Sequence, residues 1–237
     1  MSTLICFALK EEAAPFRSGL RRGHAVSILL TGIGRQNAET SVRELLGSAP
    51  APGAAVDASS TAKANDAASF ATREGACAPQ LVLTCGFAGG LNQDLKLGDV
   101  VFEVHSPESK VQSQLLAAGA RPAKFFCADR VATTVAEKKK LRDETGADAV
   151  EMESAAIHAV CEEMKIPCAT VRVISDTANE DLPLDFNALS KPDKSLDFSK
   201  LFLTVAKSPG KISALMELQI KSKFAAEKLA EVLAKLT

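Results

Sequence analysis

The sequence predicts an α/β fold that forms a single domain. Short apolar runs of strand length recur along the chain, and segments with helical periodicity lie between them. The runs are rich in Val, Ile and Leu and barely alternate with polar residues, as expected for strands that are covered on both faces. The 237 residues are 46% hydrophobic, which is enough for one buried core. Strands that alternate with helices in this way form a twisted sheet with helices packed against it.

The apolar runs are the predicted strands, and they cover residues 4–9, 25–30, 81–85, 99–104, 147–150 and 169–174. The first run has no basic segment before it and continues directly into Lys10, Glu11 and Glu12. It is therefore interpreted as a buried strand and not as a secretion signal. We expect a cytoplasmic protein.

Helical periodicity is found between the predicted strands and after the last of them. The predicted helices cover residues 36–46, 134–143, 153–164 and 212–236, and the last is long and amphipathic. Thr134 with Glu137 three residues later forms a capping-box pattern, and Gly146 suits the end of that helix. The basic run 138–140 on the same helix is interpreted as a solvated face.

Two segments are predicted loops. Residues 47–79 are dominated by Ala, Ser, Gly, Pro and Asp without a run of large aliphatic residues, which indicates a flexible surface insertion. Residues 179–199 contain Pro183 and Pro192, and we expect them to border the active site.

Composition argues against several classes of partner. The net charge is −1 and the pI is about 6.3, so there is no electrostatic case for binding nucleic acid. No apolar run reaches the length that a bilayer requires. The six cysteines form no C-x-x-C pair and the three histidines are scattered, so we predict reduced thiols, no metal site and no cofactor.

Acidic residues follow several predicted strands. Glu12 follows the first strand, Glu151 and Glu153 follow the run 147–150, and Asp176 follows the run 169–174. Ligands of open α/β sheets bind beyond the carboxyl ends of the strands, so these acids are candidates for one site. The alternative is that acids at exposed strand ends only confer solubility. A serine nucleophile has little support, because the chain contains no G-x-S-x-G motif.

Two glycine-rich strings also follow predicted strands. Residues 31–37 read Thr-Gly-Ile-Gly-Arg-Gln-Asn, and residues 85–91 read Cys-Gly-Phe-Ala-Gly-Gly-Leu. The first is not a dinucleotide fingerprint, because Asn37 stands at the third glycine position. Both strings permit close approach of a ligand to the backbone, although tight turns alone also require glycine.

The string Ala-Val-Glu-Met-Glu-Ser-Ala-Ala at 149–156, followed by Val-Arg-Val-Ile-Ser-Asp at 171–176, resembles the nucleoside phosphorylase superfamily. It is most similar to the 5'-methylthioadenosine/S-adenosylhomocysteine nucleosidase branch. Supporting matches occur in family order at 8–12, 32–34, 86–91, 98–99 and 184–186. The resemblance implies a mixed, partly closed central sheet flanked by helices, and a homo-oligomer, for which we expect a dimer.

The resemblance also implies roles for individual residues. Asp176 resembles the acid that protonates or hydrogen-bonds N7 of the purine, and this chemistry requires a carboxyl protonated near neutral pH. Glu153 resembles the carboxylate that binds the ribose 2'- and 3'-hydroxyls, and Met152 would pack under the sugar. Glu12 resembles the base that activates water on the opposite face, as in inverting glycoside hydrolysis.

Further substrate contacts are implied at positions that match the family motifs, namely Ile33, Phe87, Ala88, Gly89, Val131, Glu151 and Ser175. Two of these depart from the nucleosidase pattern. Phe87 replaces a small hydroxyl residue that faces the sugar, and Val131 is nearest to the position of an aromatic residue that stacks on the base. From residue 182 onward the chain also resembles the hopanoid-associated branch, which is expected to act on a nucleoside with a large apolar 5' group.

The sequence therefore favours a hydrolase that releases adenine from a 5'-substituted adenosine. The segment after the first strand carries Glu11 and Glu12 where phosphorylases of this superfamily carry an arginine, and carboxylates there would repel phosphate. A phosphorylase is the first alternative, with Arg35 as the candidate phosphate ligand. The second is a nucleoside-binding protein without catalysis, motivated by Phe87 and the missing aromatic residue.

Overall fold

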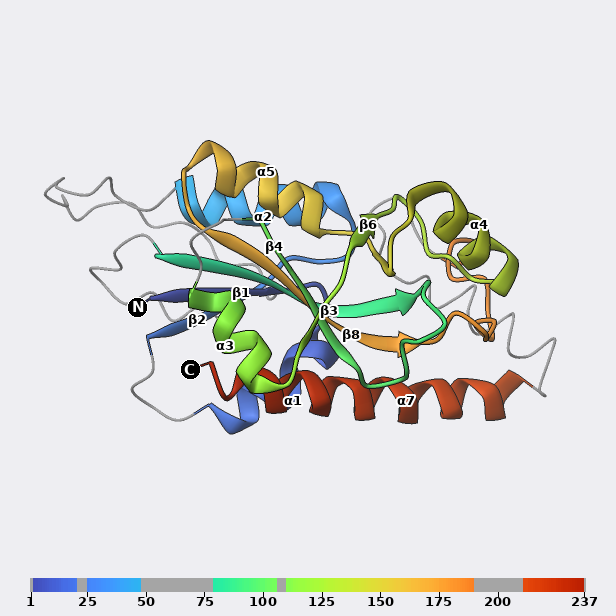
Figure 1. The fold of residues 1–237 in the computed structure, drawn as a ribbon. Helices are drawn as coiled ribbons and strands as arrows, with labels where there is room; N and C mark the ends of the chain where they lie inside the picture. The colour runs from blue at the N-terminus through green and yellow to red at the C-terminus, as the bar shows by residue number, and fades with distance from the viewer. Residues whose placement is uncertain (1, 21–24, 48–78, 106–109, 190–210, 237) are drawn as a thin grey trace, which may run out of the picture.

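A mixed β-sheet organises the residues that the computed structural model describes, which are 2–20, 25–47, 79–105, 110–189 and 211–236 (Figure 1). The strands are β1 (Thr3–Phe7), β2 (Val26–Leu30), β3 (Leu81–Gly90), β4 (Val100–Val104), β5 (Arg121–Pro122), β6 (Phe125–Cys127), β7 (Ala149–Glu151) and β8 (Cys168–Asp176). The helices are α1 (Lys10–Gly19), α2 (Arg35–Gly47), α3 (Lys110–Ala118), α4 (Val135–Thr145), α5 (Ser154–Glu163) and α7 (Lys211–Leu233).

The long strand β3 is the centre of the sheet. Its first half lies parallel to β1 with Thr3 opposite Leu81, and β8 runs parallel to it on the other side. Beyond the end of β1, β7 takes that side of β3 in the antiparallel direction, with β6 next to it. The strand order is β2-β1-β3-β8-β4-β5, with β7 and β6 branching from β3. The carboxyl ends of β1, β3 and β8 therefore point in one direction.

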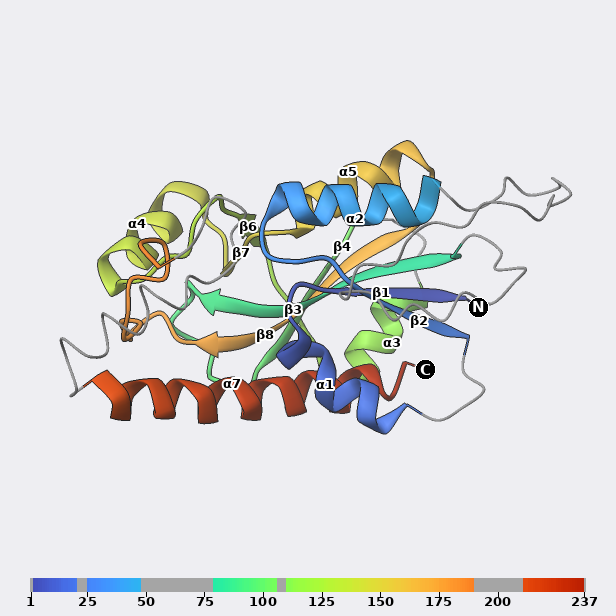
Figure 2. The same cartoon turned by 180° about the vertical axis from the view of Figure 1, so that it is seen from behind.

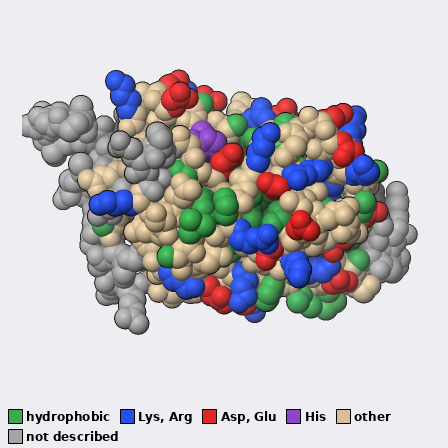
Figure 3. All heavy atoms as spheres, viewed as in Figure 1, with side chains coloured by type: hydrophobic (Ala, Val, Ile, Leu, Met, Phe, Trp, Pro, Cys, Tyr) green, Lys and Arg blue, Asp and Glu red, His purple; other side chains and the backbone are tan. Residues whose placement is uncertain are grey.

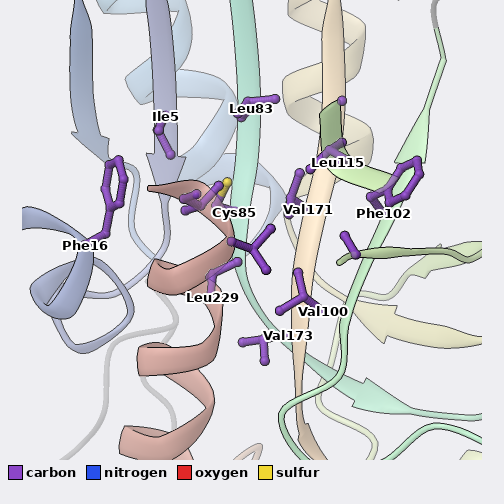
Figure 4. Packing of buried hydrophobic residues seen from close by; sticks show 14 of the residues in the cluster. Ile5, Phe16, Leu83, Cys85, Val100, Phe102, Leu115, Val171, Val173 and Leu229 are labelled. Carbon is purple, nitrogen blue, oxygen red and sulfur yellow. The ribbon is translucent and has the colours of Figure 1, made fainter. Parts of the chain in front are cut away.

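Helices cover both faces of the sheet (Figures 1 and 2). Helices α2 and α5 pack together on one face, and α1, α3 and α7 lie on the other. On the latter face Phe16 of α1 and Leu229 of α7 pack toward Leu83 and Val171 of the sheet (Figure 4). Burial of each such side chain contributes roughly 1.5–3 kcal/mol, so the two helical layers hold β3 and β8 in place from both sides.

The predicted elements are present among the described residues, with shifted boundaries. Both β3 and β8 extend further toward the site than predicted, to Gly90 and Asp176. The capping box of α4 is confirmed: Thr134 accepts a hydrogen bond from the Glu137 backbone, and Gly146 ends the helix with φ 65°. Helices α1 and α3 were not predicted. The proposed insertion 47–79 lies almost entirely outside the described residues, as does much of the segment 179–199.

The described surface mixes charges of both signs. On the face shown in Figure 3, Lys and Arg side chains are interspersed with Asp and Glu. None of the described helices combines the length and the apolar character needed to cross a bilayer. The cysteines that the structure describes (Cys6, Cys85, Cys127, Cys161 and Cys168) are free thiols, as predicted.

Candidate active site

The predicted acids meet where β1, β3 and β8 end. Glu12 lies in the first turn of α1, directly after β1, and Asp176 is the last residue of β8. Asp176 stands opposite Gly89 of β3 in the sheet register. Glu153 follows β7, the strand that pairs with the end of β3. Segments far apart in the sequence thus supply acids along the same part of β3.

Glu12 is buried and held by backbone donors. The N–H of Phe87 donates to its Oε1 (2.8 Å), and the N–H of Leu9 donates to its Oε2 (2.9 Å). Burial raises the pKa of the Glu12 carboxyl to about 7, although the charge of Arg172 and these two hydrogen bonds oppose the shift. A carboxyl with this pKa exchanges a proton near neutral pH, as a general base requires.

Gly86 makes the approach of Glu12 to β3 possible. Its φ is +146°, and a Cβ at this position would lie 2.7 Å from both Glu12 Oε1 and Arg172 Nη1. Any side chain would therefore displace the two charged groups. The glycine string at 85–91 was expected to permit close approach of a ligand; at Gly86 the groups that approach the backbone are side chains of the chain itself.

Arg172 is the common cation of the buried carboxylates. Its side chain is 1% exposed, and its Nη2 lies 2.6 Å from Glu151 Oε2 and 3.3 Å from Glu153 Oε2. The same nitrogen donates to Thr84 Oγ1 (3.1 Å). Its charge also acts on Glu12. One guanidinium therefore serves three carboxyl groups, and its pKa is raised, because their charges outweigh the effect of its burial.

Glu151 is occupied by donors of the chain itself. Its Oε2 accepts from the N–H groups of Glu153 (2.9 Å) and Ser154 (2.8 Å) and from Arg172, and its Oε1 accepts from the Ser154 hydroxyl (2.6 Å). Burial acts to raise the pKa of Glu151, but Arg172 and these donors outweigh it and hold the pKa below its ordinary value. The predicted contact of Glu151 with a substrate is therefore not supported, because its acceptor capacity is taken up in orienting Arg172 and the start of α5.

Glu153 is less fully occupied than Glu151. The N–H of Gly34, at the start of α2, donates to its Oε1 (2.9 Å), and Arg172 lies 3.3 Å from its Oε2. Burial and the neighbouring Glu151 raise the pKa of Glu153, and Arg172 opposes them. The half-buried Met152 lies beside it in the chain. Both glycine strings therefore reach the same group of carboxylates, one through Gly34 and the other through Gly86.

Asp176 has a cation of its own. Its Oδ2 lies 2.7 Å from Nζ of Lys138 on α4, and the hydroxyl of Ser175 lies 2.8 Å from its Oδ1. Gly89 leaves room for this carboxylate, because a Cβ there would lie 3.2 Å from Oδ2. The side chain of Asp176 is 11% exposed, so it is buried but reaches the surface of the site.

Lys138 corrects the interpretation of the basic run 138–140. Lys139 and Lys140 are solvated, with side chains 73% and 74% exposed, but the Lys138 side chain is 0% exposed. The helical spacing contains the signal that could have found it: Lys138 stands three residues before Leu141, which packs against the apolar core. Lys138 therefore lies on the buried stripe of α4 and not on its solvated face.

The other positions predicted to contact the substrate make contacts within the chain itself. The Phe87 side chain packs against the apolar core, and its N–H is the group that meets Glu12. Ala88 is buried, and its carbonyl oxygen lies 3.4 Å from the Ser175 hydroxyl. The backbone of Val131 is held by Asn187, and the Ile33 carbonyl accepts from the Asn37 amide.

Arg35 is directed at groups of the chain itself. Its guanidinium donates to the carbonyl oxygen of Cys127 and lies 3.4 Å from the Asp129 carboxylate. A hydrogen bond to the Cys127 side chain and the Asp129 charge raise the pKa of Arg35 despite partial burial. In this structure the half-exposed Arg35 side chain is thus engaged by groups of the chain itself.

Comparison with known proteins agrees with the fold and the motifs. The family model "Phosphorylase superfamily" matches residues 119–207. An aminodeoxyfutalosine nucleosidase of Campylobacter jejuni is 34% identical over 43% of this chain and 43% of its own length. A 5'-methylthioadenosine/S-adenosylhomocysteine nucleosidase of Bacillus cereus is 27% identical over 73% of this chain and 77% of its own. The match to the first of these relatives thus spans less than half of its length.

Solved structures share the whole fold at lower sequence identity. The 5'-methylthioadenosine/S-adenosylhomocysteine nucleosidase of Neisseria meningitidis, in complex with methylthio-immucillin-A, superposes with a TM-score of 0.64 at 18% identity. The superposition covers 100% of this chain and 98% of the Neisseria meningitidis chain. The futalosine hydrolase of Helicobacter pylori superposes with a TM-score of 0.62 at 18% identity, over 99% of this chain and 96% of its own. Together, the family-model match over part of the chain, the sequence relatives and the shared mixed α/β fold show that the chain is similar to members of the phosphorylase superfamily.

Proposed function

We propose that this chain is a nucleosidase, which uses water to cleave the N-glycosidic bond of a 5'-substituted adenosine and releases adenine. The observation that carries the proposal is the pairing of two unlike carboxyl groups along β3. Glu12 is buried, has a pKa raised to about 7 and shares its cation with other carboxylates, whereas Asp176 has a lysine of its own. Glycosidic cleavage by water needs both a base and an acid, on opposite sides of the breaking bond.

The spacing along β3 suits a nucleoside. Glu12 meets β3 at Gly86 and Phe87, and Asp176 meets it at Gly89. Two residues lie between Gly86 and Gly89, so these backbone positions are three steps of extended strand apart, a distance of about 10 Å. We propose that the attacking water, the ribose and the edge of the purine lie between the two acids.

Each acid has a task in the proposed reaction. Ionised Glu12 accepts a proton from water as the oxygen attacks C1' of the ribose. Glu153, anchored by Gly34 and Arg172, binds the ribose hydroxyls, and its negative charge favours the positive charge that develops on the sugar. Asp176 faces N7 of the departing base, where a proton makes adenine a better leaving group.

The names of the relatives support this chemistry and the class of substrate. The sequence relatives are named as nucleosidases of aminodeoxyfutalosine and of methylthioadenosine and adenosylhomocysteine. The engagement of Arg35 with Asp129 and Cys127 supports water over phosphate as the acceptor. The C-terminal part of the chain resembles the hopanoid-associated branch, and the large apolar 5' group of the substrate that this resemblance implies stays a prediction.

The test measures release of adenine from methylthioadenosine by the purified protein, with phosphate present and rigorously removed. We expect equal rates and a free thioribose product, because the acceptor is water. Labelled water should place its oxygen on C1' of that product. Strict dependence on phosphate, with a sugar 1-phosphate as product, would show a phosphorylase instead.

A homodimer and a cytoplasmic location complete the proposal. The described part of α7 carries exposed apolar side chains at a spacing of four residues, at Ile212, Met216, Ile220 and Phe224. A row of this kind supports contact with another apolar surface. Light scattering coupled to size-exclusion chromatography checks the predicted mass of two chains.

A further inference from the structure

The ion pair between Lys138 and Asp176 raises a question about the proposed reaction, on which this inference rests. A carboxylate that is paired with an ammonium group carries no proton of its own, yet the departing adenine needs one. The ammonium group is the adjacent proton carrier, since its Nζ lies 2.7 Å from Asp176 Oδ2. The proton that the base requires is therefore present in the pair, on the lysine.

Lys138 is fixed in this position by further acceptors. Its ammonium group also donates to the carbonyl oxygens of Thr177 (2.7 Å) and Glu180 (2.9 Å), in the segment that follows β8. An ammonium group has three N–H donors, and each has an acceptor here. Helix α4, which carries Lys138, lies beside this segment in both views of the fold (Figures 1 and 2).

We propose that Lys138 is a positioning residue that acts through Asp176, orienting the carboxylate toward the purine and supplying the proton that the carboxylate passes to N7. As the bond between C1' and N9 breaks, its electron pair goes to the purine. One proton moves from Lys138 Nζ to Asp176, and Asp176 delivers one to N7. The products at this end are a neutral amine, a carboxylate and neutral adenine.

The protons balance over the whole reaction. Water loses one proton to Glu12 when its oxygen bonds to C1', and the base gains one from the Lys138–Asp176 pair. Exchange with solvent then returns a proton to Lys138 and removes one from Glu12. No further reactant is needed, and the net charge of the site is the same before and after the chemical step.

The test compares Lys138→Met with Lys139→Met on two kinds of leaving group. The first is adenine, and the second is 4-nitrophenolate on the same 5'-substituted ribose, which departs as a stable anion without a proton. We expect Lys138→Met to lower kcat for adenine release by about 10²–10³-fold with little change in KM, and to change 4-nitrophenolate release by about threefold at most. Lys139→Met, on the exposed face of the same helix, should match the wild type on both.

A loss of equal size on both leaving groups would mean that Lys138 only maintains the structure, and an unchanged kcat for adenine would also overturn the inference. Lys138→Gln provides a second variant, because its amide can still donate to the carbonyl oxygens of Thr177 and Glu180 but carries no charge. The same split between leaving groups is expected for it.

A double-mutant cycle tests whether Lys138 acts through Asp176. The variant that combines Lys138→Met with Asp176→Asn leaves no unpaired charge, and it should be no slower than Asp176→Asn alone. Additive losses would contradict the proposal. If the wild-type protein releases no adenine with water, the proposed function fails. If the wild type is active but substitution of Lys138 leaves its kcat unchanged, only this inference fails.

Discussion

The two ends of the site differ in how many cations serve each carboxyl group. Around Arg172, three buried carboxyl groups, those of Glu12, Glu151 and Glu153, share one guanidinium. At the end of β8, Asp176 forms an ion pair with the ammonium group of Lys138, and no other described carboxylate lies within 4 Å of that group. Both regions are buried and both lie along β3, so the difference comes from charge and not from depth.

The unequal numbers of cations allow one sheet to hold both a base and an acid near neutral pH. In the region around Arg172 negative charge exceeds positive charge, and burial raises the pKa of Glu12 to about 7. In the region of Asp176, the carboxylate is paired with the ammonium group of Lys138. The first region is suited to accepting a proton and the second to supplying one.

Removing the shared cation is expected to have the largest effect. Arg172→Met leaves three buried carboxyl groups without their counter-charge, and we expect the free energy of unfolding to fall by roughly 3–5 kcal/mol. Urea denaturation followed by circular dichroism measures it. Arg43→Met is the matched control, because Arg43 pairs with Glu39 and Glu163 on the exposed surface, and the free energy of unfolding should stay close to that of the wild type.

Neutralising Glu12 should remove the general base of the reaction while the fold is retained. We expect Glu12→Gln to lower kcat/KM by about 10²–10⁴-fold, because water then has no acceptor for its proton. In the wild type, kcat/KM should rise with pH to a plateau with a midpoint near pH 7, since Glu12 is active only when ionised. Glu11 is the exposed residue that precedes Glu12, and Glu11→Gln should keep both the rate and the midpoint of the pH profile. If Glu11→Gln lost the midpoint near pH 7, the titrating group would be Glu11 and not Glu12.

The pH dependence of stability provides a smaller and more specific test of the same region. The pKa of Glu12 is higher in the folded chain, at about 7, than its ordinary value of 4.5. Below pH 4.5 both states bind the proton, and between these values only the folded state retains it. The contribution of Glu12 to stability is therefore fully present at low pH and lost as the pH rises through 7, by at most about 3 kcal/mol.

The measurement compares urea unfolding of the wild type and of Glu12→Gln from pH 5 to pH 8. Substitution also removes hydrogen bonds from the N–H groups of Phe87 or Leu9, but this offset does not depend on pH. The stability of the wild type should fall relative to the variant as the pH rises. A difference between the two proteins that stays constant across this range would contradict the raised pKa.

Much of the fold could be predicted from local pattern alone. Unbroken apolar runs identified every strand except the short β5 and β6, and the capping box with Gly146 located both ends of α4 to within two residues. Helices α1 and α3 were missed, because α1 is short, begins with charged residues and contains Pro15, and α3 has only a short apolar stripe. The predicted acids were found because strand ends are recognisable in the sequence and because the Glu-Met-Glu and Ser-Asp strings are specific.

The sequence pattern therefore predicted all the strands except β5 and β6, the acids that follow some of these strands, and the glycines at the strand ends. The tertiary structure decided which of those acids pair with Arg172 and which pairs with Lys138. Lys138 is one of three adjacent lysines, and only the packing of α4 against the end of β8 buries it beside Asp176 while its neighbours remain in solvent. Likewise, Arg172 could be placed on a strand, but the carboxyl groups that share it come from α1, β7 and the start of α5. Electrostatic interactions depend on distances between side chains that are far apart along the chain, and folding alone fixes those distances.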